Sequence, residues 1–280
     1  MTNFDWSRIF NFTDFAELLP LVQNSLIAGA LLGLVGGLIG IFVVKRDMSF
    51  AVHGISELSF AGAAFALLFG ANVIAGSITG SLVAALLIGA LGNKAKDRNS
   101  IIAVLMPAGL GAGILALALY EGRASNKFGL LTGQIIAVDD PQLIWLIAIC
   151  AAVILTLLLI WRPLNFASVD PEVAAARGVS TRALSIVFML LLGLAVAASV
   201  QVVGALLVLS LLVTPAAAAV RVAASPLMAT LLSVAFALVA VLGGILLALG
   251  GGLPISPYVT TISFLIYLIC RLIEWGRRGA

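Results

Sequence analysis

The feature that most constrains this chain is the recurrence of long, uncharged, apolar runs. Each run is about 20 residues long, which is enough for a helix to cross roughly 30 Å of hydrocarbon. Hydrophobic residues make up 62% of the 280 residues and charged residues only 10%, whereas soluble domains carry about 25% charged residues. Membrane β-barrels need short alternating segments instead, and the runs do not alternate. The sequence therefore predicts an all-α, polytopic membrane helical bundle.

The apolar runs predict where the chain crosses the membrane. The expected spans lie near residues 19–44, 48–69, 73–91, 101–120, 142–161, 182–200, 203–220, 226–249 and 257–273. The pair 182–200 and 203–220 is hard to separate, so eight or nine transmembrane helices are expected. Residues 1–18 are expected to form an external interfacial segment, residues 19–273 the transmembrane domain, and residues 274–280 a cytoplasmic tail.

Lys and Arg residues near span ends indicate orientation, because they collect on the cytoplasmic side. With nine spans, most of these Lys and Arg residues lie on one side of the membrane. That side includes Lys45, Arg46, Arg98, Arg162, Arg177, Arg182, Arg221, Arg271 and Arg277. The N-terminus is then expected outside and the C-terminus inside.

Glycines at small-xxx-small spacing occur inside several predicted spans. They are Gly29, Gly33 and Gly37, then Gly36 and Gly40, Gly76 and Gly80, and Gly109 and Gly113. Small residues let helix backbones approach closely in lipid, so these positions are expected to mark helix contacts.

Two ionisable residues lie inside the second predicted span. His53 is the only histidine of the chain, and Glu57 follows it four residues later. Residues at this spacing share a helix face, with Cβ atoms about 6 Å apart. A helix that starts near Met48 places Glu57 roughly 13 Å from its cytoplasmic end, near the membrane midplane. A charge there costs about 2.5–3.5 kcal/mol or more, so such residues normally face a cavity or a partner.

Three interpretations of the His53–Glu57 pair remain open at this point. Imidazole and carboxylate groups suit Zn²⁺, Mn²⁺ or Fe²⁺, and a twofold homodimer would bring two such pairs to its axis. A proton-coupled secondary carrier would use the same pair as a relay. A purely structural His–Glu hydrogen bond is the third interpretation.

The segment 162–183 carries the signals of a short cytoplasmic helix. Asp170 suits the N-cap, Pro171 the first helical position, Glu172 the first turn, Arg177 the last turn and Gly178 the left-handed position after the helix. Such a helix is either a docking element for a cytoplasmic partner or an ordinary surface helix.

Polar residues near Pro215 form a second, weaker signal. Ser210 and Thr214 precede this proline in the predicted span 203–220. They indicate either a helix break near a transport pathway or hydroxyl groups that bond to backbone carbonyls of a distorted helix. Gln201 either lines an outer vestibule or lies at a span end.

Several stretches together resemble the permease subunits of bacterial ABC importers for zinc, manganese and iron. They occur in the family's order as VVKRDMSFAVHGISELSFAGAA (43–64), LLTGQIIAVDD (130–140), DPEVAAARGV (170–179), VGALLVLSLLVTPAAAA (203–219) and GGLPISPY (251–258). The common family pattern places Asp and then His on the helix that contacts metal. His53 and Glu57 keep an imidazole and a carboxylate there in swapped order.

The resemblance implies a type II ABC importer-like permease that forms a homodimer in the bacterial inner membrane. It implies that His53 and Glu57 contact a transported divalent metal, zinc or manganese or also iron, and that no cofactor is permanently bound. It also implies cytoplasmic ATPase subunits seated against the helix at 170–178, and an external binding protein that delivers the ion. The chain has no G-x-x-x-x-G-K-[ST] phosphate loop, so ATP hydrolysis is expected in a separate subunit. No nucleic-acid partner is expected.

Overall fold

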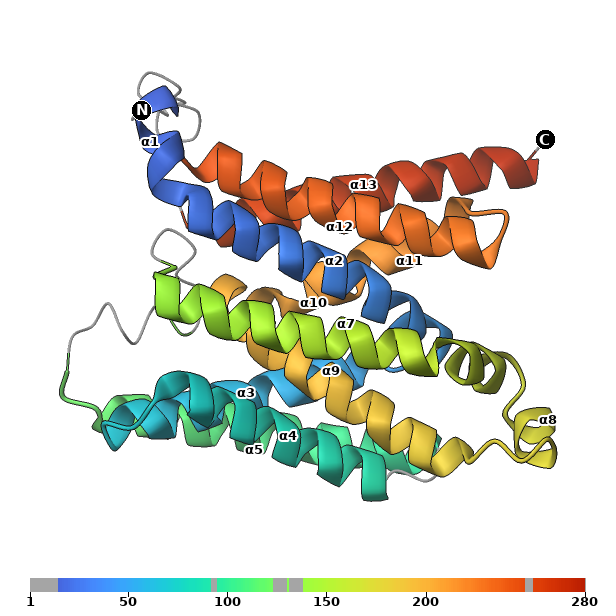
Figure 1. Cartoon of the computed structure of the whole chain (residues 1–280), viewed down its shortest axis with the longest axis horizontal. Helices are drawn as coiled ribbons and strands as arrows, with labels where there is room; N and C mark the ends of the chain where they lie inside the picture. The colour runs from blue at the N-terminus through green and yellow to red at the C-terminus, as the bar shows by residue number, and fades with distance from the viewer. Residues whose placement is uncertain (1–14, 92–94, 123–129, 131–137, 250–253, 280) are drawn as a thin grey trace.

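The computed structural model describes residues 15–91, 95–122, 130, 138–249 and 254–279 (Figure 1). These residues form helices and connecting turns, with no strand among them. Eight of the described helices are long and apolar enough to cross a membrane. The predicted all-α membrane bundle is therefore confirmed. The expected interfacial segment lies largely outside the described residues.

The helices follow the predicted spans closely. In chain order they are α1 (Phe15–Leu18), η2 (Leu19–Val22), α2 (Gln23–Lys45), α3 (Ser49–Leu68), α4 (Val73–Leu91), α5 (Ala95–Leu119), α7 (Asp140–Val169), α8 (Pro171–Ala176), α9 (Thr181–Val203), η4 (Ala205–Leu207), α10 (Val208–Leu212), α11 (Thr214–Val222), α12 (Pro226–Leu249) and α13 (Ile255–Gly279). α3, α4 and α12 lie within a residue of the expected bounds.

α7 is longer than the sequence predicts. The expected span ends at residue 161, but the helix continues through Pro163 to Val169. Asn165, in this extension, accepts a hydrogen bond of 3.2 Å from Lys45 Nζ at the end of α2. Proline inside a membrane helix is tolerated when neighbouring groups satisfy the freed backbone, so Pro163 does not end the helix.

The expected span 203–220 is an interrupted helix rather than one continuous span. α9 ends at Val203, and Gly204 adopts φ 88° and ψ 156°, a conformation that is essentially restricted to glycine. The chain then forms η4, α10 and α11, with a break at Val213 and Pro215 in the first turn of α11. In Figure 1, this interrupted segment lies among the longer helices and leads back toward the end of the bundle that carries α8. We refer to residues 204–213 as the interrupted segment.

Of the polar residues before Pro215, Ser210 bonds to a backbone carbonyl in the broken helix. The helix is broken, and Ser210 Oγ donates a hydrogen bond of 2.7 Å to the carbonyl oxygen of Leu207. The hydroxyl group therefore satisfies a backbone acceptor within the interrupted segment.

The glycine pairs mark close helix contacts, as expected. In α2, Gly33 and Gly37 pack against α12, where a Cβ added at Gly33 would lie 3.2 Å from Leu238 Cα. Gly36 packs against α10, where an added Cβ would lie 3.2 Å from the carbonyl oxygen of Leu211. Gly76 in α4 and Gly62 in α3 face each other with no space for a Cβ on either side. α2 therefore packs closely between α12 and α10.

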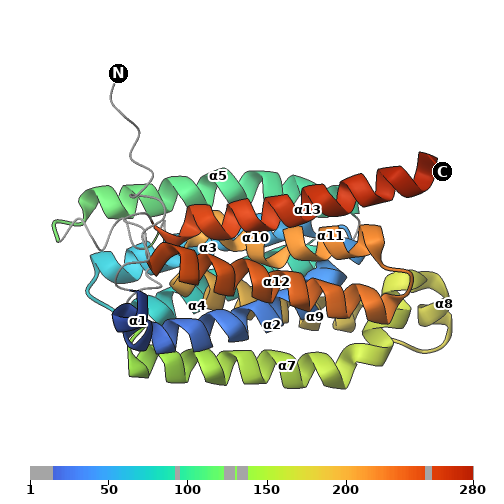
Figure 2. The same cartoon turned by 90° about the horizontal axis from the view of Figure 1, so that it is seen from above.

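The end of the bundle that carries α8 is the expected cytoplasmic end. The C-terminal ends of α2, α7, α11 and α13 lie at this end (Figures 1 and 2). At the join between α2 and α3, burial and then the charge of Arg98 lower the pKa of Arg46. Basic groups are therefore crowded here.

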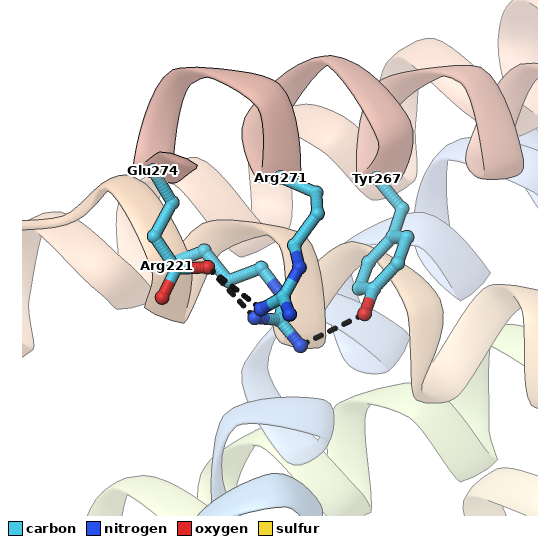
Figure 3. Close-up of polar contacts among 4 residues, drawn as sticks. All are labelled: Arg221, Tyr267, Arg271 and Glu274. Atoms are coloured by element: carbon cyan, nitrogen blue, oxygen red, sulfur yellow. Dashed lines mark hydrogen bonds and ion pairs between the residues drawn. The ribbon is translucent and has the colours of Figure 1, made fainter. Parts of the chain in front are cut away.

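A polar cluster ties α11 to α13 at the same end (Figure 3). Arg221 donates hydrogen bonds to Glu274 Oε2 at 2.7 Å and to the Tyr267 hydroxyl at 2.8 Å. Arg271 also contacts Glu274 Oε2, at 3.1 Å, from a more exposed position. The cluster fixes the C-terminal end of α11 after the interruption.

Candidate functional site

His53 and Glu57 both lie in α3, and the structure brings their side chains together. His53 Nε2 lies 3.7 Å from Glu57 Oε1, which is longer than a hydrogen bond. The side chain of Glu57 is only 5% exposed, whereas that of His53 is 30% exposed. The carboxylate is therefore deep in the bundle, and the imidazole lies between it and the accessible surface.

The side of α3 that carries the pair is exposed toward its two ends and covered at Glu57. Phe50, three residues before His53, is 68% exposed, and Phe65, eight residues after Glu57, is 38% exposed. Glu57 and Ala61, between them, are only 4% and 8% exposed. The carboxylate is therefore enclosed, whereas the phenylalanines nearer the ends of the helix are exposed.

Two neighbouring helices pack closely against α3 around Glu57. α5 approaches so closely that a Cβ added at Gly109 would lie 3.1 Å from the carbonyl carbon of Glu57. Ser59 Oγ lies 2.7 Å from Ser77 Oγ in α4. α3 is therefore in close contact with α5 at Glu57 and with α4 at Ser59.

Ser56 makes a further contact that sequence reasoning missed. Its hydroxyl group donates a hydrogen bond of 2.8 Å to the carbonyl oxygen of Ala205, in η4. The only signal in the sequence is a serine directly before Glu57, and the acceptor lies 149 residues away along the chain.

One copy of the chain offers too few donors for a complete metal site at this position. Among the described residues, no group of three or more His, Cys, Asp or Glu side chains is placed to hold a metal. A tetrahedral zinc site takes four ligands, and manganese takes more. His53 and Glu57 can therefore supply two ligands, and the remainder must come from water, another subunit or backbone oxygen atoms.

The predicted surface helix is present as α8. Asp170 is its N-cap, and its side chain accepts a hydrogen bond of 3.0 Å from the backbone N–H of Val173. Pro171 and Glu172 occupy the first turn, as predicted. Gly178 has a φ of 84°, the left-handed conformation expected after the helix. Arg177 is the C-cap residue, so it lies just past the last turn in which it was expected.

A pocket of about 440 Å³ lies at the other end of the bundle. Gln201 lines it together with Asn72, which precedes α4, and Asp139 and Gln142 at the start of α7. The pocket does not include His53 or Glu57. Gln201 thus lines a pocket at the end opposite α8.

Two of the stretches that carry the resemblance are only partly described. Most of the stretch 130–140 lies outside the described residues, as do the first three residues of 251–258.

Residues 19–274 match the ABC 3 transport family. The chain therefore belongs to this family. It is 29% identical over 271 residues to the manganese import system permease protein ScaB of Streptococcus parasanguinis, covering 96% of each chain. It is 24% identical over 246 residues to the high-affinity zinc uptake system membrane protein ZnuB of Haemophilus influenzae, covering 88% of this chain and 94% of the relative.

A solved structure supports the same assignment. The structure of PsaBC from Streptococcus pneumoniae in complex with Fab is similar with a TM-score of 0.82 and 27% identity, covering 92% of this chain and 95% of the other. This member of the ABC 3 transport family is a pore-forming, multi-pass permease subunit of the bacterial cell membrane. ATP hydrolysis belongs to a separate subunit.

Proposed function

We propose that this chain is the permease subunit of an ABC importer that moves divalent metal ions, manganese or zinc, into the cytoplasm. The observation that carries the proposal is the His53–Glu57 pair, with its two side chains 3.7 Å apart inside the bundle of a chain from this family. Relatives named for manganese and for zinc support the same class of ion. Iron remains a further candidate because its ligand preferences overlap with theirs.

In this proposal, two copies of the chain form a homodimer around the transport pathway. A twofold axis next to α3 would bring together two imidazoles and two carboxylates. Four ligands suit a divalent ion, whereas the two from one chain do not hold it tightly. A site shared between subunits also opens when the subunits separate, so the ion can leave.

α8 serves as the contact with the cytoplasmic ATPase subunit in the same proposal. Glu172, Val173 and Arg177 are exposed on this short helix, which its caps at Asp170 and Gly178 hold in place. Movement of the ATPase subunits would be passed through α8 to α7 and α9, which flank it in the chain. An external binding protein would deliver the ion at the opposite end of the bundle.

Uptake by vesicles that contain the complete complex tests the proposal. Wild-type vesicles are expected to accumulate Mn²⁺ or Zn²⁺ only when ATP is supplied on the ATPase side. Glu57→Ala is expected to abolish uptake without preventing assembly, because it removes a carboxylate ligand from the pathway. Glu121→Ala is the matched control, since it removes an exposed carboxylate outside the spans, and it should leave uptake intact.

Two results would contradict the proposal. Normal uptake by the Glu57→Ala complex would remove the metal-contacting role of the pair. Uptake by the permease alone, driven by a pH gradient without ATP, would instead establish the proton-coupled carrier.

A further inference from the structure

The hydrogen bond from Ser56 joins two unlike parts of the transmembrane domain. Ser56 lies directly before Glu57 on an unbroken helix, and its side chain is fully buried. The acceptor, Ala205, lies in the first turn after Gly204, where the helical path of the chain is interrupted. The two residues thus form a direct polar link between α3 and the interrupted segment.

The other restraints on α3 lie toward α4 and α5. Gly62 and Gly109 allow close backbone contact with these two helices, and Ser59 bonds to Ser77 of α4. These contacts fix how far α3 lies from α4 and α5. Toward the interrupted segment, α3 instead has the Ser56 hydrogen bond and its packing against η4 and α10.

We propose that Ser56 is a positioning residue, whose hydrogen bond to Ala205 sets the rotation of α3 and hence the placement of His53 and Glu57 in the pathway. This inference rests on the proposed function. A change in the interrupted segment would move the Ala205 carbonyl group and turn the two ligands with it. The interrupted segment thereby acts on the ion through Ser56 without having to contact the ion.

A small rotation of α3 affects the two candidate ions differently. Zn²⁺ favours a tetrahedral arrangement of protein ligands, so a misplaced ligand directly lowers its binding affinity. Mn²⁺ accepts oxygen ligands, including water, and a water molecule can replace a misplaced ligand. The ratio of Zn²⁺ uptake to Mn²⁺ uptake is therefore a readout of ligand placement, and the amount of folded protein does not alter it.

The test compares Ser56→Ala with Ser59→Ala in the complete complex. Both serines are fully buried in α3, and each bonds to a neighbouring segment. Groups that orient metal ligands change affinity or activity by about 10–100-fold when removed. Because Ser56 acts through the helix, we expect Ser56→Ala to lower the Zn²⁺ to Mn²⁺ uptake ratio by roughly three- to tenfold relative to wild type. Ser59→Ala should leave the ratio unchanged, and Ser56→Thr, which keeps the hydroxyl group, should restore it.

The outcomes separate this inference from the proposed function. An unchanged ratio in Ser56→Ala, in a complex whose wild-type form transports both ions, would overturn the positioning role. An equal change in Ser56→Ala and Ser59→Ala would also overturn it, because α3 packing in general would then be responsible. Absence of ATP-dependent metal uptake by the wild-type complex would instead contradict the proposed function itself.

Discussion

α3 and the segment from Gly204 to Val222 build the middle of the bundle in opposite ways. α3 is a continuous helix of 20 residues that presents polar side chains from a regular backbone. The segment from Gly204 to Val222 breaks its backbone at Gly204 and again at Val213, and almost all of its interior side chains are apolar. One region thus carries the candidate ligands at regular helical spacing, while the other supplies irregular backbone in the membrane interior. Irregular backbone there is found only where protein or a cavity surrounds it.

α3 is expected to be the more rigid of the two regions, and the interrupted segment the more mobile. α3 is fixed to α4 and α5 by contacts in which glycine allows backbone to touch backbone. The interrupted segment is fixed by glycines of α2 and, beyond it, by the cluster of Arg221 and Glu274 at the end of α11. Because its own hydrogen-bond ladder is broken, it is the part that can change conformation with least loss of helical hydrogen bonds.

The largest effect is expected from adding a methyl group where α3 meets α4. In Gly62→Ala, the new Cβ would overlap the backbone carbonyl of Gly76, which cannot move aside as a side chain can. Overpacking of this kind costs typically about 1–3 kcal/mol, and backbone contact favours the upper end. Thermal unfolding of the purified complex measures the loss.

Gly111→Ala is the matched control for this contact. It lies in α5, and a Cβ added there meets no atom within 4 Å. The control should be neutral or slightly stabilising. Equal stability of Gly62→Ala and Gly111→Ala would show that α3 and α4 are not held by close backbone contact.

A smaller effect is expected at the start of the interrupted segment. Gly204→Ala forces a residue with a Cβ into φ 88° and ψ 156°, and such strain costs on the order of 1–3 kcal/mol. Part of this cost can be relieved by relaxation of the irregular backbone, so the loss should be below that of Gly62→Ala. The same unfolding measurement applies, with Gly276→Ala in α13 as the control, since a Cβ there also meets open space. A Gly204→Ala protein as stable as this control would mean that the interruption does not depend on glycine.

The same two regions show how far the sequence determines the fold. The bounds of α3 and α4 follow from apolar runs that end at charged, glycine or asparagine residues, because hydrophobic length alone decides a membrane span. The end of α9 lies close to the boundary expected near Gln201, but the conformation of Gly204 does not follow from the sequence, because neighbouring helices decide it. The extension of α7 past Pro163 was missed for a related reason, as its support at Asn165 comes from Lys45 of another helix.

The candidate site is likewise only partly predictable from the sequence. His53 and Glu57 are identifiable because ionisable residues are costly in a membrane span, and their shared face follows from helical spacing alone. The caps of α8 are likewise local signals, readable from Asp170 to Gly178. The contact of Ser56 with Ala205 joins positions that are far apart in sequence, so only the packed structure reveals it.

In the proposed mechanism, His53 and Glu57 hold the transported ion together. Anomalous X-ray diffraction from the Zn²⁺-loaded complex, recorded at the zinc edge, would locate this ion. We expect a zinc peak about 2.0–2.2 Å from both a His53 ring nitrogen and a Glu57 carboxylate oxygen. A zinc peak elsewhere in the transmembrane domain, with His53 and Glu57 bonded only to protein groups, would contradict it.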